Sequence, residues 1–124
     1  MPGPLTPNQQ RRVDEIRGFI QTVEKVKRLV ADLESSRAMK STVIDNLCDS
    51  IARQLSQLRQ RAMSANVGTV ADRAGSLSVL AGRRGGGLSL KIRGLTEGMQ
   101  GLELQLAGAL KAALKPDDKP DAGA

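Results

Sequence analysis

The stretch IDNLCDSIARQLSQL, residues 44–58, places apolar residues at alternating steps of three and four. These positions are Ile44, Cys48, Ile51, Leu55 and Leu58, and the pattern continues at Ala62 and Ala65. An α-helix completes a turn in about 3.6 residues, so this spacing puts the apolar side chains in one narrow line, here called a seam. Because a seam leaves water only by packing against another apolar surface, the stretch predicts packing between helices.

Three other stretches carry seams of the same kind. Their apolar positions are Ile16, Phe19, Val23, Val26, Val30 and Leu33; then Val67, Val70, Ala74, Leu77 and Ala81; and finally Leu88, Ile92, Leu95, Met99, Leu102, Leu106, Ala109 and Ala113. The sequence therefore predicts a single all-α domain at residues 7–114, a hairpin or bundle of three to four amphipathic helices with heptad-like seams.

Capping residues give the expected helix bounds, which are about 7–34, 41–66, 69–81 and 89–114. Thr6, Pro7 and Gln9 have the order of a capping box, with the Thr hydroxyl accepting from the third backbone amide of the helix and Pro at the first helical position. For the second helix two caps are open, Ser35 with Ser36 or Ser41 with Thr42.

The second helix is expected to stop at Asn66 and Gly68, since both residue types end helices readily. Thr69 followed by Asp72 then repeats the order of a capping pattern and predicts the start of the third helix.

Three segments are expected to lie outside the helices. Residues 1–6 are predicted to be a flexible start, and residues 115–124 a disordered acidic tail. The glycine-rich segment at 82–87 predicts a break, because glycine loses the most backbone entropy on folding. A second interpretation stays open, since the heptad phase continues unbroken through this segment and would also suit one long helix in an assembled state.

Composition argues against catalysis. The chain has no His, Trp or Tyr, one Phe and one Cys, so the usual general base, metal ligand and stacking rings are missing together. We therefore predict no enzyme activity, no catalytic, cofactor-binding or metal site, and no small-molecule substrate. Asp45 and Asp49 share a helical face and are interpreted as solvated charges, and the glycine-rich segment lacks the Lys and Ser or Thr of a phosphate-binding loop.

Glycine also recurs every seven residues, at Gly94, Gly101 and Gly108. A glycine inside a helix costs up to about 1 kcal/mol relative to alanine, so the repetition asks for a reason. One hypothesis is that these glycines let a neighbouring helix approach closely. The other is that this part of the chain is a weak, flexible helix.

The middle of the chain is basic. Residues 35–94 hold ten Lys or Arg against three Asp or Glu, within a chain of net charge +6. The candidate contacts for a nucleic acid or another polyanion are Arg53, Arg61, Arg73, Arg83, Arg84, Lys91 and Arg93. The lack of aromatic residues counts against sequence-specific reading of single strands.

The leading functional hypothesis is a structural or adaptor protein that assembles through its seams, with itself as a homo-oligomer or with another helical protein. The residues predicted to form the seams, either as oligomer contacts or as packing within the bundle, are Ile16, Phe19, Val23, Val26, Val30, Leu33, Ile44, Ile51, Leu55, Leu58, Leu95, Met99, Leu102 and Leu106.

Two alternatives belong to other classes. The first is sequence-independent nucleic-acid binding, and the second is an amphipathic protein of a membrane or lipid-body surface. The lack of Trp, the single Phe and the mixed charges of the first helix disfavour a membrane-surface location. No apolar run approaches the roughly 20 residues that span a bilayer, and the N-terminus lacks the pattern of a secretory signal. The lone Cys48 is interpreted as a small buried hydrophobe, which fits a reducing cytoplasm.

Overall fold

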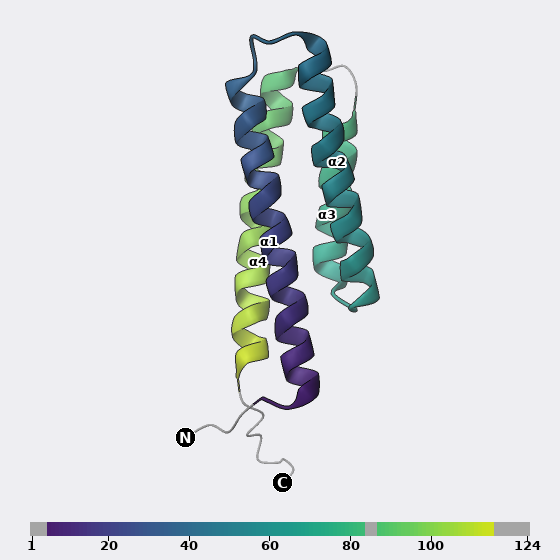
Figure 1. The fold of residues 1–124 in the computed structure, drawn as a ribbon, viewed down its shortest axis with the longest axis vertical. Coiled ribbons are helices and arrows are strands. Elements are labelled where there is room, and N and C mark those ends of the chain that lie inside the picture. The colour runs from purple at the N-terminus through teal and green to yellow at the C-terminus, as the bar shows by residue number, and fades with distance from the viewer. Residues whose placement is uncertain (1–4, 84–86, 116–124) are drawn as a thin grey trace.

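A computed structural model describes residues 5–83 and 87–115 of the chain. This part contains no strand and has four helices, which are α1 (Pro7–Ser35), α2 (Ser41–Ser64), α3 (Gly68–Gly82) and α4 (Leu88–Leu114). Consecutive helices run up and down beside one another, and α4 returns to lie beside α1 (Figure 1). Each helix thus packs against two neighbours in a closed ring. The predicted all-α helical bundle is confirmed.

The start of α1 is fixed by the expected capping box. The backbone N–H of Gln9 donates to Thr6 Oγ1 at 3.1 Å, and the backbone N–H of Thr6 donates to Gln9 Oε1 at 2.8 Å. Pro7 is the first helical residue, where its missing N–H costs nothing.

The expected caps of α2 and α3 are wrong. Lys40 precedes α2 and Val67 precedes α3, and neither side chain makes a capping hydrogen bond. Before α2 the chain instead turns through a backbone hydrogen bond from Met39 N–H to Ser36 O, at 2.9 Å. Ser41 is consequently already helical.

Asn66 ends α2 in the way its residue type predicts. Its φ of 61° lies in the left-handed region, which Asn tolerates better than most side chains. Asn66 N–H donates to Met63 O at 3.1 Å and Val67 N–H donates to Ala62 O at 2.8 Å, so the last carbonyls of the helix are satisfied as in a Schellman motif. This tight reversal starts α3 at Gly68, before Thr69 could cap it.

The helical path breaks at the glycine-rich segment. Arg83 after α3 and Gly87 before α4 both have extended backbone angles, with ψ of 131° and 132°. In this structure α3 and α4 are therefore separate helices that form an antiparallel pair, and the continuous helix of an assembled state stays a prediction. Residues 84–86, the start at 1–4 and the predicted tail from 116 onward lie outside the described residues.

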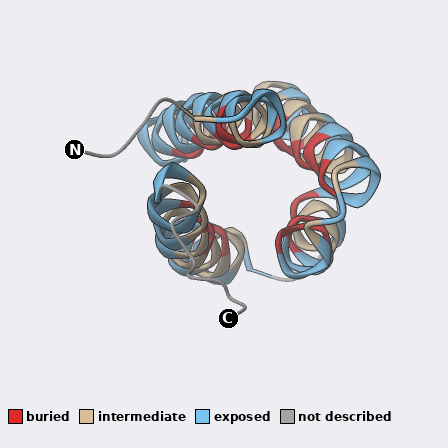
Figure 2. Cartoon of the chain, turned by 90° about the horizontal axis from the view of Figure 1, so that it is seen from below, coloured by how far each residue is buried: buried red, intermediate tan, exposed pale blue. Residues whose placement is uncertain are grey.

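The four seams meet in one core. Viewed along the bundle, the buried residues line the inner faces of all four helices (Figure 2). Every seam residue proposed as an assembly contact is buried within the chain except Ile44, which is half-buried and packs against the core. The other helices of the same chain therefore cover the apolar surface of these residues, and assembly with a second chain stays a prediction.

Candidate interaction surfaces

One side of α4 is glycine and faces α3. A Cβ built on Gly94 would lie 2.8 Å from Leu80 Cδ2, and one built on Gly98 would collide with the side chain of Leu77. At Gly101 the nearest atom is Arg73 Nη1, at 2.7 Å. The closely packed glycines therefore follow steps of four and three, which keep them on one face of the helix.

The prediction that glycines of α4 line a close helix contact is thus correct for Gly94 and Gly101 and wrong for Gly108. A Cβ built on Gly108 would have no neighbouring atom within 4 Å, so this glycine does not line a close contact in the chain. Gly98 does line one, but it lies outside the seven-residue repeat and was missed for that reason. Spacing at three and four, applied to glycine as it was to the apolar residues, would have found it.

A groove runs between α1 and α4 on the outside of the bundle. Its volume is about 490 Å³, and it is lined by Ile20, Val23, Glu24, Glu103, Leu106, Ala107, Leu110, Lys111 and Leu114. Val23 and Leu106 form part of the buried core, whereas Leu114 is 41% exposed. The groove is therefore an apolar furrow with charged side chains at its borders. We call it the α1–α4 groove.

An ion pair limits this groove on the side toward the α1–α2 connection. Lys27 Nζ lies 2.7 Å from Glu103 Oε2 and so bridges α1 and α4. Both side chains are roughly two-fifths exposed, at 45% and 39%, so the pair is worth only about 0.2–1 kcal/mol. Beyond it a smaller hollow of about 260 Å³ continues between the same helices, next to Val30 and Met99.

The hollow between α1 and α2 has a different character. It is about 550 Å³ in volume and open, and it is lined by Asp14, Glu15, Gly18, Phe19, Gln60, Arg61 and Ser64. Carboxylates of one helix thus face an arginine of the other, which is a mixed charged surface. It offers no row of apolar side chains, because Phe19 is the one large apolar residue in its lining.

The residues proposed to bind a polyanion do not form one surface. Arg61 lies near the end of the bundle where α2 joins α3, whereas Arg83 and Lys91 flank the connection of α3 to α4 at the opposite end. Arg53 is on α2 and Arg93 is on α4, and these two helices are not neighbours in the bundle. Arg84 lies outside the described residues.

Several of these cations also have partners within the chain. Arg73 Nε donates to Gln105 Oε1 at 3.1 Å. Lys91 Nζ donates to the carbonyl oxygen of Arg83 at 2.7 Å, which satisfies one backbone acceptor after α3. Arg93 Nε is 3.8 Å from Glu97 Oε2, one turn along α4. Arg59, which is not among the predicted contacts, packs along Gly75, with its Cδ 3.0 Å from a Cβ built there.

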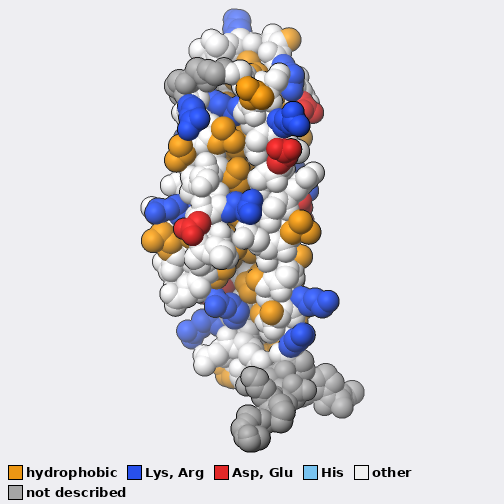
Figure 3. Space-filling view, turned by 180° about the vertical axis from the view of Figure 1, so that it is seen from behind, with side chains coloured by type: hydrophobic (Ala, Val, Ile, Leu, Met, Phe, Trp, Pro, Cys, Tyr) orange, Lys and Arg blue, Asp and Glu red, His pale blue; other side chains and the backbone are white. Residues whose placement is uncertain are grey.

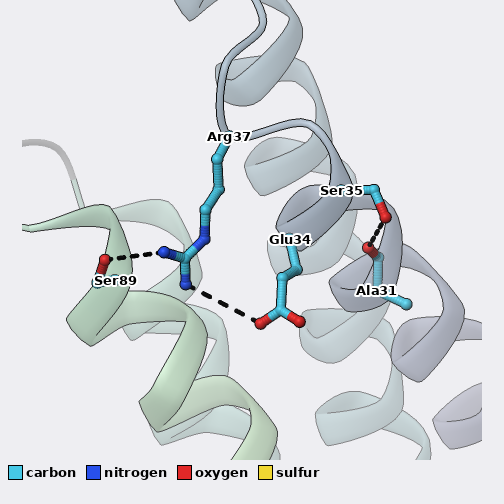
Figure 4. A network of polar contacts seen from close by, with 5 residues as sticks. All are labelled: Ala31, Glu34, Ser35, Arg37 and Ser89. Carbon is cyan, nitrogen blue, oxygen red and sulfur yellow. Dashed lines mark hydrogen bonds and ion pairs between the residues drawn. The ribbon is translucent and has the colours of Figure 1, made fainter.

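The end of the bundle that holds the α1–α2 connection has its own polar contacts. Arg37 reaches from that connection to α4, where its Nη1 donates to Ser89 Oγ at 3.1 Å (Figure 4). Its Nη2 lies 3.9 Å from Glu34 Oε2, and nearby the Ser35 hydroxyl donates to Ala31 O at 3.0 Å. Arg37 therefore joins the end of α1 to the beginning of α4.

The lone thiol is inside the bundle. Cys48 is 1% exposed, as its place in the α2 seam predicted, and Lys91 Nζ lies 3.8 Å from its Sγ. The described residues bury no polar or charged side chain, and they contain no group of three acidic, His or Cys residues that could hold a metal ion.

Large apolar side chains also lie scattered on the outside. They are Met39, Met63, Val79, Leu90, Leu104 and Leu114, with Leu104 the most exposed at 76%. Figure 3 shows hydrophobic side chains interspersed with charged and uncharged polar groups over the face formed by α3 and α4. No helix in the described part of the chain is long and apolar enough to cross a membrane.

Comparisons with protein-family models, with curated proteins and with solved structures found no match to this chain.

Proposed function

We propose that this protein is a non-enzymatic adaptor that binds a helix of a partner on the outer side of its α1–α4 pair. The observation that carries the proposal is the α1–α4 groove, the most apolar of the surface hollows described above. Its floor and borders combine partly exposed Ile20, Leu110 and Leu114 with charges that can fix the orientation of a partner. An apolar furrow between two helices is the shape into which an amphipathic helix packs.

Energetics supports a docking role for this surface. Removing apolar surface from water stabilises a complex by about 25 cal/mol per Å². The seam residues cannot supply this surface, because they are already buried in the core. Assembly therefore needs an outer surface. A helix in the groove would cover Leu114, which is 41% exposed, together with the apolar sides of its neighbours.

The amino-acid composition supports the proposal that the adaptor is not an enzyme. The chain has no His and a single Cys, and that Cys lies in the core. We also propose a reducing cytoplasm as its location, since a chain with one Cys cannot form an internal disulfide.

Site-specific photo-crosslinking in the native cell tests this function. A photoreactive residue at Leu114 is expected to trap a protein, while the same residue at Met63 on α2, which is 52% exposed, serves as the control and should not. The mass of the adduct tells a second copy of the chain from a different protein. Failure to trap any protein at Leu114, or equal trapping at both positions, would contradict the proposal.

A second candidate function is polyanion binding at the end of the bundle where the α1–α2 and α3–α4 connections lie. The observation that favours it is that Arg37 and Lys40 of the α1–α2 connection lie at the same end of the bundle as Arg83, which follows α3. This differs from the surface expected from the sequence, because Arg53, Arg61 and Arg73 do not contribute.

Retention on heparin with increasing salt tests the second candidate. Reversal of Lys40 and Arg83 to Glu should lower the salt concentration of elution, whereas the same double charge reversal at Arg53 and Arg59, on the side of α2, should lower it much less. Equal shifts in the two variants would show that only net charge matters and would exclude a site at this end.

A further inference from the structure

The outward face of α4 is arranged symmetrically about Leu104. Glu97 lies seven residues before Leu104 and Lys111 seven residues after it, while Gln100 and Gly108 lie four before and four after. All five residues are exposed. Steps of three and four keep them on one face of the helix, with the charged positions about 10 Å from Leu104 along the axis.

We infer that this face is the contact between two copies of the chain, in which the α4 helices pair antiparallel around a twofold axis at Leu104. The inference rests on the proposed function, in which a partner's helix packs on the outer side of the α1–α4 pair, and it names that helix as α4 of a second copy. Leu104 itself is not among the residues that line the α1–α4 groove, so the contact is centred on the neighbouring side of α4. A twofold axis brings each residue before Leu104 opposite the residue at the same distance after it in the other copy. Glu97 therefore meets Lys111 twice, and Leu104 meets itself.

Size and burial along this face fit the pairing. Leu104 is 76% exposed, the highest value among the large apolar residues described, so it has surface to lose. Gly108 has open space where a side chain would be, and in the pair it lies opposite the longer Gln100. Small against large is the complementarity that close helix packing needs. The second α4 also lies along the border of the α1–α4 groove at Ala107 and Lys111.

The charges further out limit the length of the contact. Arg93 would meet Lys115 of the other copy, which is a pair of like charges. Arg93 is already 3.8 Å from Glu97 within its own helix, and Lys115 lies beyond the end of α4. Helices that cross at about 20° also diverge toward their ends. The favourable contact thus extends from Glu97 to Lys111, which is short for an interface, and we expect association at tens to hundreds of micromolar, on the order of a weak transient complex.

Charge reversal with sedimentation equilibrium provides the main test. Glu97→Lys and Lys111→Glu should each weaken self-association about tenfold or more, because each creates two repulsive pairs. An equimolar mixture of the two variants should regain the parent's affinity, since every Lys then faces a Glu. Circular dichroism checks that each variant keeps the helix content of the parent.

Disulfide trapping tests the axis itself. In a Cys48→Ser background, Leu104→Cys should form a covalent dimer under mild oxidation much faster than Leu90→Cys, a comparably accessible control on the same helix that is 71% exposed. A parent that stays monomeric at millimolar concentration, a mixture that fails to associate, or equal trapping at the two positions would overturn the inference. If the Leu114 photo-crosslink captures a different protein while the isolated chain is monomeric, the adaptor function stands and the second copy is excluded.

Discussion

Three glycines of α4 lie in three different surroundings. Gly98 faces the side chain of Leu77, which is 6% exposed and has little room to move. Gly101 faces the guanidinium of Arg73, the far end of a flexible side chain at the surface. Gly108 faces open space. The intrinsic gain in helix propensity from Gly to Ala is the same at all three, so the neighbour decides the sign of the effect on stability.

This yields a matched pair of variants. Gly98→Ala should lower the free energy of unfolding by about 1–3 kcal/mol, because Leu77 must shift to admit the methyl group. Gly108→Ala should raise it by up to about 1 kcal/mol through helix propensity alone. Urea unfolding at low micromolar concentration measures both. Stabilisation by Gly98→Ala would show that α3 and α4 are farther apart than the structure has them.

Asn66 provides a second prediction for a single residue. Its φ of 61° suits glycine best and strains a β-branched side chain. Asn66→Gly should therefore leave the melting temperature unchanged or raise it slightly, whereas Asn66→Val should cost about 1–2 kcal/mol and lower it. Asn66 is exposed, so neither substitution changes apolar burial and the difference between the two variants reports on the backbone conformation. Equal melting temperatures would contradict the left-handed conformation.

At the scale of the elements, the helices were predictable because each apolar seam lies between two stretches of residues that end helices. The start of α1 follows from Thr6 and Gln9, which act over three residues, and the end of α2 follows from the conformational tolerance of Asn66. The starts of α2 and α3 were missed because a backbone turn, rather than a capping hydroxyl, sets them. The close contact at Gly98 and the α1–α4 groove could not be predicted, because each depends on which helices become neighbours. The residue pattern of a single helix does not specify its neighbours.

The seam of α2 gives a prediction at this scale. Leu55 is fully buried, and Leu55→Ala should lower the free energy of unfolding by about 2–5 kcal/mol through lost apolar contact and the cavity that it leaves. Arg53→Ala, two residues away on the exposed side, should change it by less than about 0.5 kcal/mol. Urea unfolding compares the two, and similar losses would mean that α2 presents another face to the core.

For the whole molecule, the sequence left open whether the seams meet within one chain or between chains. The sequence pattern of a seam is the same in both cases, since it requires an apolar surface to pack against but does not specify whether that surface belongs to the same chain or to another. The connections at residues 36–40 and 65–67 are short, which makes consecutive helices antiparallel neighbours. Once α4 closes the ring beside α1, all four seams are covered, so any assembly must use the outer surface.

The same closure makes the single thiol a reporter of the whole bundle. Cys48 is 1% exposed and belongs to the cluster that all four helices share, so a bulky thiol reagent can reach it only when the bundle opens. We expect native Cys48 to react at least about a thousandfold more slowly than an exposed thiol, since opening costs several kcal/mol. Leu104→Cys in a Cys48→Ser background supplies the exposed control. Because the core is one cluster, the rate at Cys48 should rise with urea with the slope of global unfolding. A rate close to that of the control would show instead that α2 separates from the bundle in the native state.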